Sequence, residues 1–346
     1  MSQKTCLFYT PFNSTSDREG YVYMLRLMNF SVHSSDLEKF EGDYNKIKQF
    51  LRKNGLHGLE LIQHSSWDAG DIPASMIVGL HMRFWPIWLD FWKEDKAELL
   101  RQFGDEDSYR HYYGGSTRSA LIEHYRNELK TAIDMGAEYV VFHVSHVQLE
   151  HCYNYRFTYK DREVVEAFIE MLNEILEGMD AKFDLLLENL WWPGLTLTDK
   201  KIAARLMEGI NYPNKGFMLD TGHLMNTNRE LKTEEEAVEY MLKVLEKLDE
   251  LSVYIEGIHL NSSLSGEYVK NEILRGGEYD PEEAFFNRYL KAFGHISKID
   301  RHMPFTHPSV KKIIEFIKPQ YLVYELLTDS LEELDEYVEV QNKALE

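Results

Sequence analysis

Acids and histidines recur in this sequence at the ends of short apolar runs. The stretch 216–223 shows the pattern most completely, because an apolar run ends at Asp220, turns through Gly222 and presents His223 three residues after the acid. An Asp before Thr-Gly is also ordinary turn chemistry. An acid or a histidine also ends five further apolar runs, however, at or beside His81, His143, Glu188, His259 and Glu325.

Carboxylate and imidazole groups are the side chains that hold divalent ions. Taken singly, a histidine at a strand end is more often a hydrogen-bonded structural residue, and a glutamate there often pairs with Lys or Arg. Several carboxylates that meet in one place repel one another unless a cation lies between them. The pattern therefore predicts a site for Mn²⁺, Zn²⁺, Co²⁺ or Mg²⁺, with a core of Glu188, Asp220, His259 and Glu325.

The runs that carry these residues are short, apolar and rich in β-branched residues, as strands are. Eight such candidate strands lie at 5–9, 58–63, 77–81, 139–143, 183–188, 216–220, 255–259 and 321–325. Amphipathic runs that predict helices lie at 43–54, 117–135, 160–178, 198–209, 233–251, 309–317 and 330–344. Expected helix N-caps are Thr117, Thr198, Thr233 and Ser309.

This alternation predicts an α/β fold, a single (β/α)8 TIM barrel spanning residues 1–346. The carboxyl ends of its strands would gather the acids and histidines at one mouth, with His223 in the loop after its strand. An open doubly wound sheet is the alternative. No Gly-rich phosphate loop follows the first run, so the dinucleotide-binding version of that sheet is disfavoured.

Two connections, at about 82–116 and 260–307, are too long for a plain barrel and predict insertions at the carboxyl ends of the strands. The first is rich in aromatic residues. Trp85, Trp88 and Trp92 recur at helical spacing, which indicates the buried face of an additional helix. The same residues are also suited to an aromatic wall over an active site, and the two roles are compatible.

Composition narrows the class of protein further. The chain has 346 residues and a formal net charge of −20, from 58 acids against 38 Lys and Arg. Extended nucleic-acid binding is disfavoured, since phosphate neutralisation requires a basic face. No apolar run approaches the length of a membrane span, and the first residues lack a signal-peptide pattern. With two cysteines, we expect a cytoplasmic protein, and a homo-oligomer is possible.

Four motifs resemble those of the xylose-isomerase-like TIM-barrel superfamily: Leu187-Glu188-Asn189, the run 219–223, Ile258-His259-Leu260-Asn261 and Val323-Tyr324-Glu325. That superfamily includes sugar isomerases and epimerases and also endonuclease IV, of AP endonuclease family 2. The resemblance extends over essentially the whole barrel and leaves out the two long connections.

Resemblance to the epimerase branch implies one divalent ion held by the four core residues. It also implies that Glu188 and Glu325 act as acid and base on opposite faces of a small polyhydroxy substrate. Residues expected to contact that substrate are His81, His143, Trp191, Trp192, His223 and Arg301.

Resemblance to the endonuclease branch implies nine ligands and three zinc ions. The five further ligands would be His81, His143, His223 and the pair Asp300 and His302 of an Asp-Arg-His triplet. The chain departs from that branch in the long connection before Asp300, in the sequence after His302 and in the bulky Trp191-Trp192 pair after Glu188.

These departures suit a small substrate better than a DNA backbone. We therefore predict a metal-dependent isomerase or epimerase of a sugar or sugar phosphate. A phosphodiester hydrolase with a multinuclear site is the alternative, and a multinuclear site that acts on a small molecule is a third outcome. A barrel that binds a sugar or metal without catalysis is the least favoured.

Overall fold

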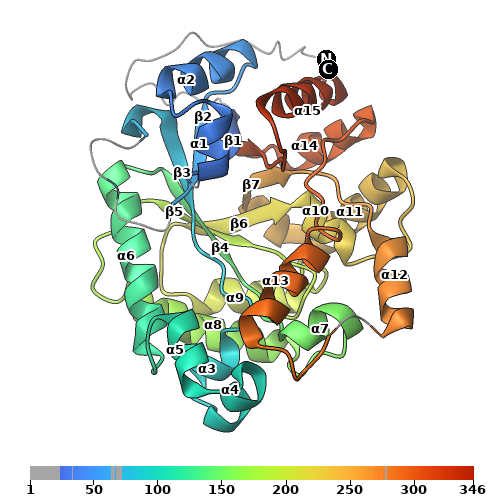
Figure 1. Ribbon diagram of the computed structural model, residues 1–346. Coiled ribbons are helices and arrows are strands. Elements are labelled where there is room, and N and C mark those ends of the chain that lie inside the picture. The colour runs from blue at the N-terminus through green and yellow to red at the C-terminus, as the bar shows by residue number, and fades with distance from the viewer. Residues whose placement is uncertain (1–23, 33, 64–66, 68–71, 277–278) are drawn as a thin grey trace.

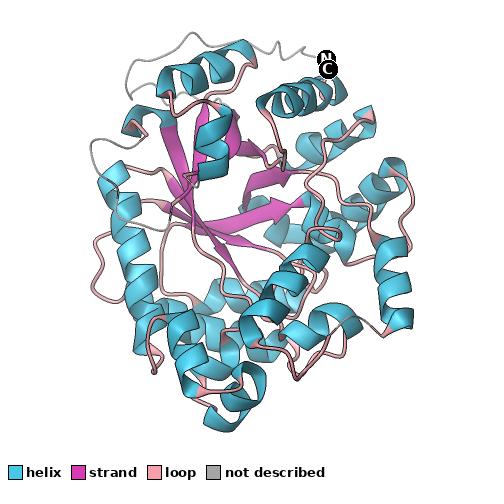
Figure 2. Ribbon diagram, viewed as in Figure 1, coloured by secondary structure: helices cyan, strands magenta, loops and turns pink. Residues whose placement is uncertain are grey.

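Eight parallel strands close into a barrel in the order of the chain, with β1 hydrogen-bonded to both β2 and β8. The computed structural model describes residues 24–32, 34–63, 67, 72–276 and 279–346. Figures 1 and 2 show the strands at the centre with helices around them. The strands are β1 Leu25–Ser31, β2 Gly58–Ile62, β3 Ile77–His81, β4 Tyr139–His143, β5 Asp184–Glu188, β6 Lys215–Asp220, β7 Ile255–Leu260 and β8 Tyr321–Tyr324. The predicted (β/α)8 barrel is confirmed.

The first strand was predicted wrongly. The run 5–9 lies outside the described residues, and the barrel begins with Leu25–Ser31, which the sequence analysis missed. This strand reads LRLMNFS, in which apolar and polar residues mostly alternate. Arg26 and Asn29 interrupt the apolar run twice within seven residues, so the segment was not recognised as a buried strand.

The long helices pack outside the barrel: α2 Tyr44–Lys53, α6 Ser119–Met135, α8 Asp161–Leu176, α9 Lys200–Gly209, α11 Glu234–Leu248, α14 Lys311–Ile317 and α15 Leu331–Ala344. Between them lie α1 Ser34–Lys39 and the 3₁₀ helices η1 Ala74–Met76, η2 Asp249–Tyr254 and η3 Pro308–Val310. Thr233 caps α11 as predicted, because its Oγ1 accepts the N–H of Glu236. The other predicted caps are wrong, since each helix takes its cap one residue later than Thr117, Thr198 or Ser309.

Large side chains fill the amino-terminal half of the barrel interior. Tyr139 and Tyr321 lie with ring centroids 4.2 Å apart, and both are buried. Gly79 makes room for them, because a Cβ at that position would come within 2.1 Å of the Tyr139 ring. This packed layer forms the floor beneath the strand ends.

The two long connections form helices of their own at the carboxyl end of the barrel. The first carries α3 Leu89–Trp92, α4 Lys96–Phe103 and α5 Glu106–Tyr113, and the second carries α12 Gly266–Arg275 and α13 Phe285–Ile296. They meet where Phe103 stacks on Phe285, with ring centroids 4.0 Å apart, and Figure 1 shows α4 and α13 on the same side of the molecule. No helix among the described residues is long and apolar enough to cross a bilayer.

The tryptophans of the first connection form a packed cluster. Trp85 lies against Tyr112 and Tyr113, and Trp88 donates its indole N–H to the carbonyl of Ser145. Trp85, Trp88 and Trp92 are all buried. Burial was therefore the correct interpretation, although only part of the segment is helical.

Candidate metal centre

Strand register places the predicted ligands side by side at the barrel mouth. His143 is paired with Glu188 across β4 and β5, and Asp220 is paired with His259 across β6 and β7. Two short helices add to the mouth, α7 Leu149–Asn154 and α10 Thr221–Asn226. His223 lies in the first turn of α10, not in a loop as predicted, and Asp220 caps that helix by accepting the N–H of His223.

The two carboxylate oxygens of Glu188 face different histidines. Oε2 lies 3.1 Å from His81 Nε2 and 3.2 Å from His143 Nε2. Oε1 lies 3.2 Å from Nδ1 of His259 and 3.2 Å from Nδ1 of His223. A carboxylate whose oxygens are directed to two separate sets of imidazoles has the geometry of a bridge between two ions.

The other predicted ligands complete three adjacent clusters. His259 Nδ1 is 3.3 Å from Glu325 Oε2 and 3.9 Å from Asp220 Oδ2. Acids and histidines form four groups, and within each group the donor atoms lie within 4.8 Å of one another. Three of these groups contain all nine predicted ligands. They are His81, His143 and Glu188; Glu188, Asp220, His259 and Glu325; and His223, Asp300 and His302. Below they are called the first, the central and the third cluster.

The third cluster is assembled across the long second insertion. Asp300 Oδ2 lies 3.1 Å from His223 Nε2 and 2.8 Å from His302 Nε2. A single antiparallel bridge between Ser262 and Met303 returns the chain to the end of β7. This bridge places Asp300 and His302 over the mouth of the barrel. The Asp-Arg-His triplet therefore lies beside His223 in spite of the long insertion that precedes it.

Hydrogen bonds to backbone carbonyls orient three of the imidazoles so that the other nitrogen of each is directed at the clusters. Nδ1 of His81 lies 2.9 Å from the carbonyl of Met82, and Nδ1 of His223 lies 2.9 Å from that of Asn189. Nδ1 of His302 lies 3.2 Å from the carbonyl of Glu325. Only an N–H donates to a carbonyl, so these bonds assign the proton to Nδ1 and leave Nε2 free to bind an ion.

Two observations show that these residues fit divalent ions. Glu188 Oε1 and His259 Nδ1 are buried and form no hydrogen bond within the described part of the chain. Separations of 3.1–3.3 Å between ligand atoms also match the edge of a tetrahedron, about 3.3 Å for metal–ligand bonds of about 2.0 Å. Ions at these positions would satisfy both buried atoms.

The charges of the mouth are strongly coupled. Burial would lower the pKa of the His302 imidazole, but Asp300 and Glu325 raise it to about 10. Burial, together with the carboxylates of Glu325 and Asp300, raises the pKa of Asp220 well above its usual range despite the opposing effect of His223. In spite of burial, nearby imidazoles lower the pKa of Glu188 and of Asp300. The excess of negative charge is therefore local to Asp220, where a cation would compensate it.

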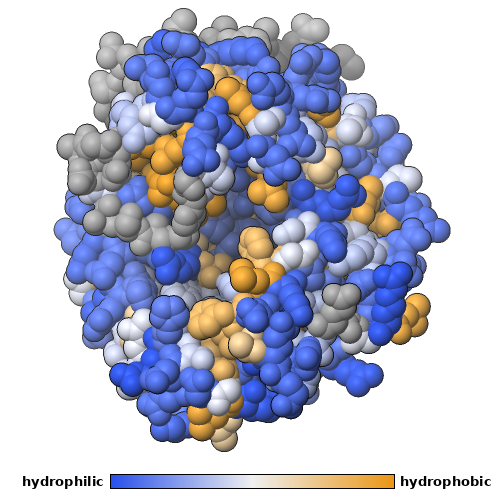
Figure 3. Space-filling view, viewed as in Figure 1, coloured by the Kyte–Doolittle hydropathy of each residue, from blue (hydrophilic) through white to orange (hydrophobic). Residues whose placement is uncertain are grey.

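The remaining predicted residues lie around the clusters. The Trp191 ring is 5.2 Å from that of His223, and Trp192 packs behind it; both indoles are buried, so they support the imidazole more than they face a substrate. Phe84 lies 4.6 Å from His143 on the other side. The Arg301 side chain is exposed, while its backbone N–H donates to Ser263 Oγ. Figure 3 shows this face hollowed near its centre, with hydrophilic residues within and hydrophobic ones along parts of the rim.

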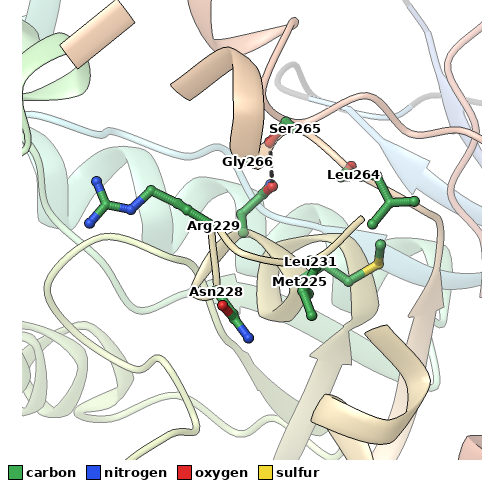
Figure 4. Close-up of a pocket in the computed structure, with 9 residues that line it drawn as sticks. Met225, Asn228, Arg229, Leu231, Leu264, Ser265 and Gly266 are labelled. Carbon is green, nitrogen blue, oxygen red and sulfur yellow. Dashed lines mark hydrogen bonds between the residues drawn. The ribbon is translucent and has the colours of Figure 1, made fainter. Parts of the chain in front are cut away.

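Another hollow lies beside the third cluster, between α10 and the start of α12 (Figure 4). Ser265 donates to Asn226 across it. The Arg229 side chain extends away from the other lining residues, so their polar groups do not converge. Ser263 separates this hollow from the clusters, since its Oγ lies 3.4 Å from Asp300 Oδ1.

Sequence reasoning missed several polar residues that hold the ligands. Asn261 donates to Asp220 Oδ2 at 2.8 Å, and Asn189 both accepts from and donates to the Asp220 backbone. Glu60, fully buried in β2, lies 3.0 Å from His259 Nε2. The available signal was a carboxylate in the middle of an otherwise apolar strand, GLELI, where the alternation of side chains points it into the barrel.

Together, the fold and the site define a (β/α)8 barrel whose strand ends carry a ligand set for divalent ions. The chain belongs to the xylose isomerase-like TIM barrel family, whose model matches residues 77–339. A comparison with curated proteins gives no match.

Solved structures share the fold at low identity. Endonuclease IV from Thermus thermophilus aligns with a TM-score of 0.52 and 14% identity, over 93% of this chain and 98% of that one. Mannonate dehydratase from Streptococcus suis serotype 2 aligns with a TM-score of 0.50 and 11% identity, over 93% and 92%. A D-tagatose 3-epimerase-like protein aligns at 0.40 with 14% identity, over 92% and 91%.

Proposed function

We propose that this protein is a metal-dependent phosphodiester hydrolase with a three-ion centre. The observation that carries the proposal is the position of Glu188, whose two oxygens face two different groups of imidazoles. A site for one ion would need only one of these groups. The ranking of the sequence analysis is therefore reversed, and the hydrolase comes first.

Divalent ions in the clusters would supply the positive charge that stabilises a phosphoryl group and lowers the pKa of water. The protein contributes the geometry. Glu188 holds the first and central clusters at a fixed separation, and Asp300 orients the imidazoles of His223 and His302. Phe84 and Trp191 flank the clusters on either side and limit access of bulk water.

A small phosphodiester is the substrate that we favour over duplex DNA. The net charge of −20 disfavours a long polyanion, because such a ligand gains affinity by neutralising many phosphates. Chain ends and loops of nucleic acid present the same phosphodiester, so an abasic oligonucleotide belongs among the substrates to be tested.

The experiment begins with metal analysis of protein purified without chelators, followed by hydrolysis of bis-p-nitrophenyl phosphate and of abasic DNA. We expect about three zinc or other divalent ions per chain and hydrolysis that His143→Ala abolishes, since His143 belongs to the first cluster only. His111→Ala is the matched control, the same change at an exposed histidine of α5 that belongs to none of the clusters. One ion per chain with no hydrolysis would refute the proposal.

The second candidate is the isomerase or epimerase of a small polyhydroxy substrate. It is favoured by the symmetric positions of Glu188 and Glu325, which lie 3.2 and 3.3 Å from the same nitrogen of His259. Two carboxylates on either side of a bound ketose suit proton removal and return. Solvent deuterium entering a ketose, and lost in both Glu188→Gln and Glu325→Gln, would support this reaction and place the hydrolase second.

A further inference from the structure

Glu60 has no place among the nine ligands, yet it is a carboxylate buried in the barrel directly beneath them. It lies in the middle of β2, is fully inaccessible to solvent and is paired in register with Gly79 of β3. Tyr139 donates its hydroxyl to Glu60 Oε2 at 2.7 Å. The same oxygen lies 3.0 Å from His259 Nε2.

Its position determines how His259 can act. His259 donates its Nε2–H to Glu60, so the proton of the neutral imidazole stays on Nε2. Nδ1 then has a free lone pair that is directed toward Glu188 and Glu325. A carboxylate that accepts from a ligating imidazole makes the imidazole a stronger donor and fixes its ring. Tyr139 holds Glu60 in turn, and Gly79 leaves the space that the Tyr139 ring needs.

Charge gives a second, independent reason. A buried carboxylate is costly unless a positive charge lies nearby. One ion among Glu188, Asp220 and Glu325 would already be outnumbered by negative charge, so Glu60 would add to the excess. Three divalent ions outweigh the four ligand carboxylates of the clusters, and Glu60 then offsets part of the remaining positive charge.

We propose that Glu60 is a positioning residue for the central ion, which it acts on through His259, and that it supplies a buried counter-charge for a three-ion centre. The inference rests on the metal centre of the proposed function but not on the reaction. Glu60, His81 and His259 form the fourth of the groups whose donor atoms lie within 4.8 Å of one another. Glu60 is hydrogen-bonded to His259 of the central cluster, so its main effect falls on the central ion.

The test uses the full chain loaded with zinc, with metal bound as the readout. In Glu60→Gln the side chain keeps its shape and loses its charge. We expect one of three ions to bind about 10- to 100-fold more weakly, so that chelator titration removes it while two remain. Tyr139→Phe keeps the carboxylate but removes its bond, and we expect a smaller weakening of the same ion. The Co²⁺-loaded protein should show a changed visible spectrum for one ion.

Glu128→Gln is the matched control, an identical change at a buried acid of α6 outside the clusters. Its charge acts on His81 of the first cluster, so it should leave the affinity of the central ion, held by His259, unchanged. Three ions held with wild-type affinity in Glu60→Gln would overturn the inference and leave the hydrolase standing. A fourth ion in the wild type that Glu60→Gln removes would also overturn it, because Glu60 would then be a ligand. Fewer than three ions in the wild type would refute the proposed centre and this inference together.

Discussion

Replacing Glu128 with Gln should change how stability depends on pH. Glu128 is buried on α6, where it accepts the backbone N–H of Arg83 at 2.8 Å. This bond ties α6 to the segment that follows His81. Burial raises the pKa of Glu128 from 4.5 to about 7, although the N–H and the charge of Arg83 oppose the shift.

The sign follows from the direction of that shift. A carboxyl whose pKa is higher in the folded state favours folding at low pH, where both states are protonated, and loses that advantage as pH rises from about 4.5 to about 7. A difference of that size corresponds to about 3 kcal/mol in full, of which about 2.5 kcal/mol falls between pH 5 and pH 8. The Gln variant does not titrate, so it escapes this loss.

Urea unfolding of wild type and Glu128→Gln at pH 5 and pH 8 measures the effect, with chelator present in all samples. Among the histidines of the mouth, only His81 interacts with the charge of Glu128, and the others contribute equally in both proteins. We expect the variant to gain about 2 to 3 kcal/mol relative to wild type from pH 5 to pH 8. If both proteins change in parallel, the carboxyl is not held in a desolvated site and the reasoning is wrong.

Three further changes have definite expected outcomes. Gly79→Ala should destabilise the barrel by about 1–3 kcal/mol in urea unfolding, because the new Cβ overlaps the Tyr139 ring. Gly294→Ala, whose Cβ meets no atom within 4 Å, should be neutral or slightly stabilising. Equal effects of the two changes would contradict the packing argument. Chelation should lower the melting temperature and added zinc should restore it, since ions that bind only the folded chain stabilise it; an unchanged melting curve would count against the metal centre. Burial raises the pKa of the Cys152 thiol, so it should resist a thiol reagent such as DTNB in the native protein and react after denaturation; rapid native reaction would show that it is accessible.

Much of the fold and site was already readable in the sequence. Seven of the eight strands were placed, because their runs are short, mostly apolar and end at or beside a polar residue. The acids and histidines at those ends were expected to meet, since parallel strands in a closed barrel present the same end to one mouth. The structure brings all nine predicted ligands together, and their binding of metal stays a prediction.

Tertiary structure decided the features that depend on contacts between distant segments. Arg26 and Asn29 broke the apolar pattern of the true first strand, which only pairing with β2 and β8 reveals. Asp300 reaches His223 through the bridge between Ser262 and Met303, a contact that no local pattern encodes. The direction of each Glu188 oxygen depends on side-chain torsions set by packing.

Glu60 illustrates the difference most clearly. Sequence shows a glutamate within an apolar strand, and alternation places it inside the barrel. Its pairing with His259, almost two hundred residues away, arises only when the barrel closes and stacks β2 and β7 around one interior. Strand periodicity depends on neighbouring residues, so it can be recognised in the sequence. The charges that surround a buried group depend on distant segments, so only the closed fold determines them.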